Sequence, residues 1–228
     1  MSYRTILFDA DNTLLDFTRS EHEALCDCLR ARGLPCDKAI TEGYAAINDR
    51  HWKLLEQGLT TRDRLRVARF EDFCREYSFD CDPRHLADDY FDTLCTKSYL
   101  INGALELCER LHGHCRLYII TNGNAKVQHD RFDATPLAPL FEEVFISEEM
   151  GVSKPSSAYF GAVAAAIPDF NPTDTLVVGD SLTSDIQGGI NAGLATCWYN
   201  PRGKSAPTDM KINYIVRSLD EIPSIVSN

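Results

Sequence analysis

The sequence predicts an α/β fold in which a parallel sheet carries an inserted helical domain. Three observations support this prediction: short apolar runs alternate with helical segments in the second half of the chain, an all-helical stretch fills much of the first half, and a single apolar run precedes that stretch. Continuous apolar strands are typical of parallel sheets covered by helices on both faces. We therefore expect residues 1–15 and 100–228 to form the sheet core and residues 16–99 to form the helical domain.

The expected strands are six apolar runs, most of which end at a polar or glycine-containing loop. They are Thr5–Phe8, Leu117–Ile120, Glu143–Ile146, Thr175–Val178, Ala195–Tyr199 and Tyr214–Val216. Helical segments, for example Ser156–Ile167 and Ser181–Ala192, lie between most of these runs. This alternation is the pattern from which the parallel sheet is predicted.

Four helices are expected in the inserted stretch. The first has the spacing of a capping box at Ser20 and Glu23. The second ends at Gly58, the third starts near Thr60, and the fourth begins at Pro83, because proline suits the first turn of a helix. An insertion of this size predicts a second, smaller domain.

Composition and charge exclude several classes of protein. The 228 residues are 44% hydrophobic and carry a formal net charge of −11, which argues against a nucleic-acid polymer or an anionic membrane as the main partner. No apolar run approaches the roughly 20 residues needed to span a bilayer, and the N-terminus lacks the pattern of a signal peptide. The nine cysteines form no regular framework, and Cys26 and Cys28 are expected to be small buried or half-buried thiols. We expect a reduced, cytoplasmic protein.

Polar residues follow three of the predicted strands. Asp9 and Asp11 come after the first strand, Thr121 and Asn122 after the second, and Asp180 after the fourth. The carboxyl ends of parallel strands form the edge where open α/β sheets bind ligands. Aspartate, asparagine and threonine are also common in turns, so each short motif taken alone is equally compatible with a plain turn.

Taken together, these residues predict a cation site. Asp9, Asp11, Asp180 and Asp185 would repel one another in one crevice unless a cation lay among them, and hard oxygen ligands suit Mg²⁺. Lys154 could balance the carboxylates and hold an anionic group. The hydroxyl of a threonine and the N–H groups of a strand-end turn can bind phosphate oxygens.

Four motifs, in this order, resemble those of the haloacid dehalogenase superfamily of phosphohydrolases. They are Asp9-x-Asp11-x-Thr13, Thr121-Asn122-Gly123, Lys154-Pro155 and Gly179-Asp180-x4-Asp185. The resemblance covers the whole chain, and it implies a Rossmann-like parallel core with the helical insertion as a cap of the C1 type. It also implies that Mg²⁺ is the cofactor and that the substrate is a small phosphate ester.

The resemblance implies a role for each carboxylate of the motifs. Asp9 would be the nucleophile that forms an aspartyl-phosphate, and Asp11 would be the general acid and then the general base. The carboxylates of Asp9 and Asp180 and the backbone carbonyl of Asp11 would bind Mg²⁺. Asp185 would act on the metal indirectly, through the residues that bind it or through water. Thr13 would orient the loop.

The remaining motif residues would bind the phosphoryl group. This set comprises Asn12, Thr121, Asn122 and Lys154, of which Thr121 and Lys154 also belong to the implied catalytic residues.

Two further stretches, Ile146–Pro155 and Gly188–Trp198, are similar to the subgroup of pyrimidine 5'-nucleotidases that act on noncanonical nucleotides. That similarity implies a pyrimidine nucleotide as substrate, with Trp52, Arg69 and Phe70 of the cap facing it. Other readings of these three residues remain open. Arg69 has the spacing for a surface ion pair with Asp72 or Glu76, and Trp52 and Phe70 have the spacing of cap core residues.

Three alternative functions remain at this stage. A phosphatase for a small phosphorylated acid or sugar, such as phosphoglycolate, would need the same motifs. A haloacid dehalogenase is disfavoured, because that branch usually has a non-acidic residue where Asp11 stands. A protein that only binds a phosphorylated ligand would also retain the motifs, and release of phosphate from an aryl phosphate distinguishes it from an enzyme.

Overall fold

The computed structural model describes residues 3–227, and the chain divides into two compact units. The core unit comprises Met1–Asp16 and Ser98–Asn228, and the inserted unit comprises Phe17–Lys97. The chain therefore leaves the core unit after its first strand and returns to it about 80 residues later, as a domain insertion does.

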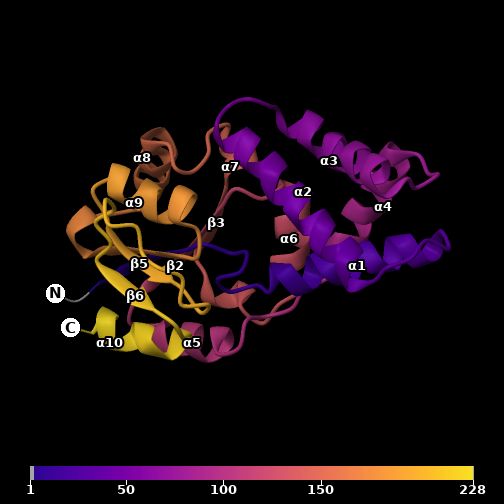
Figure 1. Ribbon diagram of the computed structural model, residues 1–228. Coiled ribbons are helices and arrows are strands. Elements are labelled where there is room, and N and C mark those ends of the chain that lie inside the picture. The colour runs from indigo at the N-terminus through magenta and orange to yellow at the C-terminus, as the bar shows by residue number, and fades with distance from the viewer. Residues whose placement is uncertain (1–2, 228) are drawn as a thin grey trace. The chain divides into compact units, whose positions relative to one another are not determined.

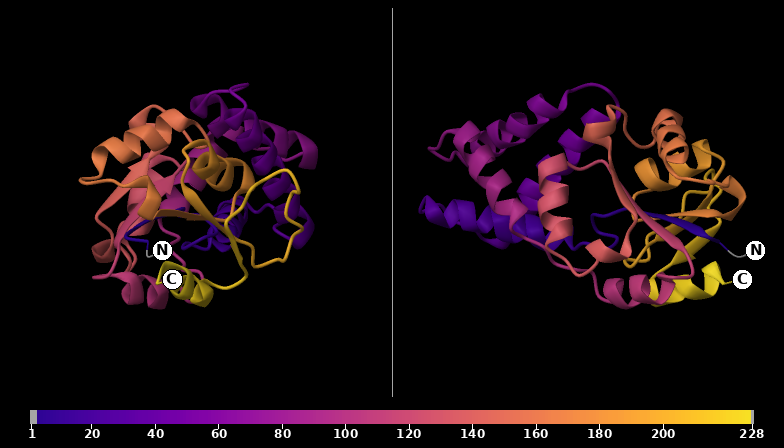
Figure 2. Two further views of the ribbon diagram at one scale, coloured as in Figure 1. Left: turned by 90° about the vertical axis from the view of Figure 1, so that its left-hand side faces the viewer. Right: turned by 180° about the vertical axis from the view of Figure 1, so that it is seen from behind.

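The core unit is built on a six-stranded parallel sheet (Figures 1 and 2). Its strands are β1 (Thr5–Phe8), β2 (Arg116–Thr121), β3 (Glu143–Ile146), β4 (Thr175–Gly179), β5 (Ala195–Tyr199) and β6 (Tyr214–Val216). The strand order is β3-β2-β1-β4-β5-β6, and every neighbouring pair is parallel. The predicted α/β class and its six apolar runs are confirmed.

Helices cover both faces of this sheet. They are α5 (Ala104–Leu111), α6 (Ala125–Asp133), α7 (Ser147–Met150), α8 (Ser157–Ala166), α9 (Gln187–Asn191) and α10 (Ile222–Val226), with a π-helical turn η3 (Leu182–Ile186) and short 3-10 turns η1 (Ala138–Leu140), η2 (Pro172–Asp174) and η4 (Leu219–Glu221). In Figure 1, α5 and α10 lie on one face, and α8 and α9 lie on the other. Alternate residues of β1 follow this division, because Ile6 and Phe8 pack in the cluster that contains Leu107 of α5, whereas Leu7 packs with Tyr159 of α8.

The topology determines where a site can form. From β1 the chain builds β2 and β3 on one side, and β4, β5 and β6 follow on the other. The carboxyl ends of β1 and its neighbours therefore surround the point where the strand order reverses, which is the usual ligand site of such sheets. The residues that directly follow β1 and β4 are Asp9 and Asp180.

The inserted unit is helical, as expected for this stretch. Its helices are α1 (Phe17–Ala31), α2 (Lys38–Glu56), α3 (Arg62–Tyr77) and α4 (Pro83–Cys95). Asp37, Thr61 and Asp82 cap the last three helices with side-chain hydrogen bonds. Aromatic rings fill the interior, where the centroids of the Phe70 and Tyr90 rings lie 5.1 and 5.5 Å from that of Tyr44. This packing defines a small core independent of the sheet.

The capping box predicted at Ser20 is wrong. Helix α1 begins at Phe17, so Ser20 lies inside the helix, and its hydroxyl donates to the carbonyl of Lys97 at 3.0 Å. Glu23 accepts a hydrogen bond from Arg19 at 2.8 Å. The spacing of a capping box also occurs within helices, and here other partners bind both side chains.

Cys26 is not the free thiol that the sequence predicted, because it forms a disulfide with Cys36. Cys36 lies in the loop between α1 and α2, and that loop folds back until the two Cα atoms are 5.4 Å apart. Cys28 is a free, buried thiol, as expected. The other free cysteines are Cys74, Cys81, Cys95, Cys108, Cys115 and Cys197.

No helix in residues 3–227 combines the length and the apolar character that crossing a membrane requires. Helix α2, for example, has 19 residues but includes charged side chains at several positions. The cytoplasmic location stays a prediction.

Candidate active site

The loop after β1 fixes the first motif aspartate. The backbone N–H of Asp9 donates to the carbonyl of Val178 at 2.8 Å, which continues the pairing of β1 with β4. The Thr13 hydroxyl donates to Oδ2 of Asp9 at 3.3 Å, so Thr13 orients this carboxylate. Asn12 turns the loop with a left-handed φ of 60°, and its backbone N–H donates to the carbonyl of Leu15. A phosphate contact from Asn12 would therefore come from its side chain.

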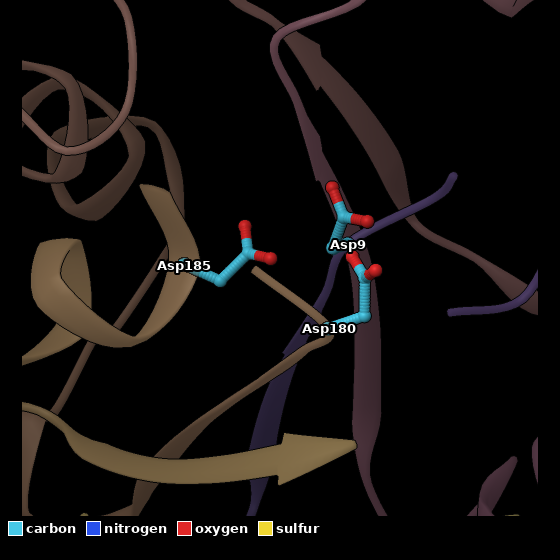
Figure 3. Close-up of side chains that lie close together, drawn as sticks. All are labelled: Asp9, Asp180 and Asp185. Atoms are coloured by element: carbon cyan, nitrogen blue, oxygen red, sulfur yellow. The ribbon is translucent and has the colours of Figure 1, made fainter. Parts of the chain in front are cut away.

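Three carboxylates converge at the ends of β1 and β4 (Figure 3). Asp9 follows β1, Asp180 follows β4, and Asp185 belongs to the π-helical turn η3. One oxygen from each lies within 4.8 Å of the others. In Figure 3 the Asp185 carboxylate points toward the other two.

Lys154 is the cation that the structure places against this cluster. Its side chain is 1% exposed, and Nζ donates to Oδ1 of Asp9 at 2.7 Å, to Oδ1 of Asp185 at 2.6 Å and to the carbonyl of Ile120 at 2.9 Å. An ammonium group has three donors, so each has a partner here. Burial opposes the charge of Lys154, but the carboxylates of Asp185 and Asp9 outweigh it and raise the pKa of the ammonium group.

The charge of this cluster fits a divalent cation. Three carboxylates face one ammonium group. Burial and then the neighbouring Asp185 raise the pKa of Asp180 to about 7, and the same two causes raise the pKa of Asp9 despite Lys154. Burial and the mutual repulsion of the carboxylates both disfavour their ionised forms, and a bound cation would offset both effects. Clustered carboxylate oxygens are the donor set that Mg²⁺ prefers.

Both oxygens of Asp185 already have partners. Oδ1 accepts from Lys154, and Oδ2 accepts from the backbone N–H of Ser181 at 3.1 Å. Asp185 therefore holds Lys154 and the strand-end loop in place, whereas the carboxylate of Asp180 points toward Asp9 in Figure 3.

The carboxylate of Asp11 lies outside the three-carboxylate cluster, in a separate set of contacts. Its Oδ1 accepts from Nη1 of Arg131 at 2.7 Å, and its Oδ2 accepts from Nε2 of Gln128 at 3.0 Å. Sequence reasoning did not select Gln128 or Arg131. The available signal was their spacing of three residues, which places both on one face of the helix that follows the Thr121 motif.

The Thr121 motif prepares a hydrogen-bond donor. The hydroxyl oxygen of Thr121 accepts from the backbone N–H of Gly123 at 3.1 Å and from Nε2 of Gln128 at 2.6 Å. Because a hydroxyl has two lone pairs and one proton, what remains for a ligand is the donating O–H. Such a donor suits a phosphoryl oxygen, which can only accept.

The side chain of Asn122 binds the backbone of Lys154. Its side-chain amide donates to the carbonyl of Lys154 at 2.9 Å, and its amide oxygen accepts from the backbone N–H of Lys154, also at 2.9 Å. These two bonds attach the loop of Lys154 to the end of β2. A phosphate contact from Asn122 would therefore come from its backbone.

Two motif glycines make room for side chains of the site. A Cβ on Gly179 would lie 2.3 Å from Oδ2 of Asp185, and a Cβ on Gly123 would lie 2.6 Å from the side chain of Gln128. Neither glycine has the positive φ at which glycine is favoured for its backbone. Space alone therefore explains glycine at these two positions.

In the inserted unit, the surface ion pair expected as an alternative for Arg69 is wrong. Arg69 is 6% exposed, and its Nη1 donates to Asn48 at 2.7 Å. Asp72 instead binds His51 and Arg50, at 2.9 and 3.2 Å. Because the guanidinium is buried, its partner is the interior residue Asn48 rather than an acidic residue on the helix surface.

The two aromatic candidates in this unit differ. Phe70 is fully buried between Tyr44 and Tyr90, so the packing supports the alternative in which it belongs to the core of the unit. Trp52, on α2, is half-buried.

Comparison with known proteins agrees with this geometry. Residues 3–193 match the haloacid dehalogenase-like hydrolases. The chain is 38% identical to the HAD-hydrolase YfnB of Bacillus subtilis over 225 residues, which cover 99% of this chain and 96% of YfnB. A crystal structure of YfnB bound to magnesium, which reveals interdomain movement, has a TM-score of 0.94 and covers 99% of both chains.

Two further relatives are named as nucleotidases. The chain is 35% identical to the pyrimidine 5'-nucleotidase PynA of Streptococcus pneumoniae over 223 residues, which are 97% of this chain and 94% of PynA. It is 31% identical to the pyrimidine 5'-nucleotidase YjjG of Escherichia coli over 226 residues, 99% of each. With the motifs at the strand ends and a family match across most of the chain, the protein belongs to the haloacid dehalogenase-like hydrolases.

Proposed function

We propose that this hydrolase is a Mg²⁺-dependent phosphomonoesterase that acts on pyrimidine nucleoside 5'-monophosphates through an aspartyl-phosphate. The observation that carries the chemistry is the separation of two aspartates. Asp9 lies against Lys154 and the carboxylate cluster, whereas Asp11 lies apart with Arg131 and Gln128. Two carboxyl groups in different surroundings suit two different roles. The similarity to PynA and YjjG over nearly the whole chain supports the choice of substrate.

The proposed reaction has two steps. In the first, Oδ of Asp9 attacks phosphorus, the bond from phosphorus to the ester oxygen breaks, and Asp11 gives its proton to that oxygen. In the second, Asp11 takes a proton from water, the water oxygen attacks phosphorus, and the bond from phosphorus to Asp9 breaks. The products are the free nucleoside and inorganic phosphate, and both aspartates return to their starting state.

Other residues of the core unit support these steps. Lys154 keeps Asp9 in position and offsets negative charge, while Thr121 donates its hydroxyl proton to a phosphoryl oxygen. Asp9, Asp180 and the backbone carbonyl of Asp11 would hold Mg²⁺. When bound, Mg²⁺ supplies positive charge to the phosphoryl oxygens as charge moves between them.

Substrate selection is assigned to the inserted unit in this proposal. The core motifs bind a phosphoryl group and have no means of distinguishing the groups esterified to it. We assign residues 16–99 as the cap, with Arg69 and Trp52 as its contacts to the nucleotide and Phe70 as internal support. The donor Nε of Arg69 has no hydrogen-bond partner within the described residues, which supports a polar contact there.

A panel of phosphate esters tests the proposal. Phosphate release should be measured for pyrimidine and purine 5'-monophosphates, sugar phosphates, phosphoglycolate and 4-nitrophenyl phosphate, with Mg²⁺ present. We expect kcat/KM for pyrimidine monophosphates to exceed that for phosphoglycolate by at least about a hundredfold, or about 2.8 kcal/mol. Preference for phosphoglycolate or a sugar phosphate would transfer the proposal to that substrate class. No phosphate release from any ester would reject phosphohydrolase activity.

A further inference from the structure

One face of α6 carries a buried polar network that none of the four motifs contains. Gln128 is 1% exposed and Arg131 is fully buried, which is unusual for side chains of this polarity. They are three residues apart and therefore lie on the same face of the helix. Nη1 of Arg131 also donates to Oε1 of Gln128 at 3.3 Å.

This network ends on two residues of the proposed reaction. Asp11 receives one donor on each oxygen, from Arg131 at 2.7 Å and from Gln128 at 3.0 Å. The same Nε2 of Gln128 donates to the Thr121 hydroxyl at 2.6 Å. The carboxylate of Asp11 is thus held at both oxygens. Gln128, which holds one of them, also contacts Thr121, the proposed hydrogen-bond donor to the phosphoryl group.

We propose that Gln128 and Arg131 are positioning residues that orient the Asp11 carboxyl group for its two proton transfers. This inference rests on the proposed function, because it assigns how Asp11 is held during that reaction. A carboxyl group that is free to rotate would present its proton, and later its basic oxygen, in many directions. Two donors from one rigid helix fix the plane of the group, and positioning within a few tenths of an ångström strongly affects rates of proton transfer.

The burial of Arg131 is coupled to its ion pair with Asp11. A fully buried guanidinium costs several kcal/mol unless it is paired, and an arginine that served only the helix could remain in solvent. Here the ion pair is with Asp11, which is itself partly exposed at the end of β1. The arginine is therefore buried beneath the residue that has to meet the substrate.

Pre-steady-state kinetics with 4-nitrophenyl phosphate tests this role. The 4-nitrophenolate leaving group needs little protonation, so the first step should be nearly independent of Asp11, whereas the second step needs Asp11 as base. In Arg131→Met and Gln128→Met we expect the burst of 4-nitrophenol to keep its rate within about threefold. The following steady-state rate should fall by at least about thirtyfold, so that phosphoenzyme accumulates. Because kcat/KM depends on binding and the first step alone, KM for 4-nitrophenyl phosphate should fall in proportion to kcat, and kcat/KM should stay within about threefold.

A poor leaving group supplies the second readout. With a nucleoside monophosphate, both steps need Asp11, and we expect kcat to fall by at least about a hundredfold in the same variants. Arg131→Lys, which keeps the charge, should recover part of this loss. Lys126→Met is the matched control, because Lys126 is on the same helix and pairs with Asp130 on the exposed side. It should leave both steps unchanged.

The outcomes separate the role from its alternatives. Equal losses in both steps, or no loss in either, would overturn the positioning role. If the methionine variants do not fold, Arg131→Lys and Gln128→Glu carry the same test, since each still has to slow the second step more than the first. A wild-type protein that releases no phosphate and forms no phosphoenzyme would reject the proposed function instead, before any variant is compared.

Discussion

Each of the two units buries a basic side chain beside acidic or polar partners. Every donor of the basic side chain has a hydrogen-bond partner in the core unit, whereas one donor lacks a partner among the described residues in the inserted unit. In the core unit, all three donors of Lys154 have partners, two of them carboxylates. In the inserted unit, Arg69 donates to Asn48, which in turn donates to Glu21 at 2.6 Å. Nε of Arg69 has no hydrogen-bond partner within the described residues.

The contrast shows where each unit is preorganised. A buried donor without a partner costs about 1–3 kcal/mol, so a protein tolerates one only where something offsets that cost. The core unit has the three acceptors of Lys154 in place without any ligand. The inserted unit leaves one buried donor, Nε of Arg69, without an acceptor among the described residues.

The largest expected effect is in the core unit. Asp9→Asn keeps the shape of the side chain but replaces the nucleophile with a carboxamide, so kcat should fall by at least about a thousandfold. Phosphate release is the measurement, and an unchanged melting temperature would show that the fold remains. Asp133→Asn, at the exposed end of α6, serves as the control. Activity within about tenfold of the wild type would remove Asp9 from its role.

Removal of the metal should have the next largest effect. Excess chelator should lower phosphate release by at least about a hundredfold, because the carboxylate cluster needs a cation to polarise the phosphoryl group. Restored Mg²⁺ should return the activity, whereas an equal ionic strength of NaCl should not. Full turnover in chelator would mean that Lys154 alone balances the cluster.

The inserted unit should respond more weakly and more selectively. Arg69→Ala should lower kcat/KM for pyrimidine monophosphates by about tenfold, or about 1.4 kcal/mol, while 4-nitrophenyl phosphate is nearly unaffected. Arg69 is buried, so the variant should also lose a few degrees in melting temperature, from the loss of about 1–3 kcal/mol of hydrogen bonding. Arg75→Ala, on the exposed part of α3, is the matched control. Equal losses on both substrates would reduce Arg69 to a structural role.

The smallest effect concerns stability and pH. The pKa of Asp180 is raised to about 7 from an ordinary 3.8, mainly by burial and next by Asp185. The folded state therefore holds a proton that the unfolded state has released, so this contribution to stability is present below about pH 4 and is lost as the pH rises through about 7. In chelator, the wild type should lose a few degrees in melting temperature relative to Asp180→Asn between about pH 5 and pH 8.

Added Mg²⁺ should reverse that loss, and it should stabilise the wild type more at the higher pH, where Asp180 is ionised. A difference between wild type and Asp180→Asn that stays constant with pH would contradict the raised pKa.

The same contrast explains which features were predictable. A parallel sheet fixes where its strands end, so Asp9, Thr121 and Asp180 could be located once the apolar runs were recognised. Lys154 lies in a loop, but its motif order was enough to assign it to the cluster.

Helices offered less information. The face that a helix presents depends on packing partners that are distant in the sequence, so Gln128 and Arg131 were not recognised, and Arg69 was equally compatible with a surface pair. Ser20 and Cys26 were misread for the same reason, since their partners Lys97 and Cys36 come from other segments.

The two glycines that make room in the site restrict the order in which substitutions can be accepted. A larger residue at position 123 is compatible with the fold only after Gln128 has become smaller, and one at position 179 only after Asp185 has. Each pair is therefore epistatic. A smaller residue at position 185 would remove a hydrogen-bond partner of Lys154. A smaller residue at position 128 would remove a donor to Asp11 and Thr121. Substitution of either glycine is therefore coupled to loss of a side chain that contacts the site, Asp185 for Gly179 and Gln128 for Gly123.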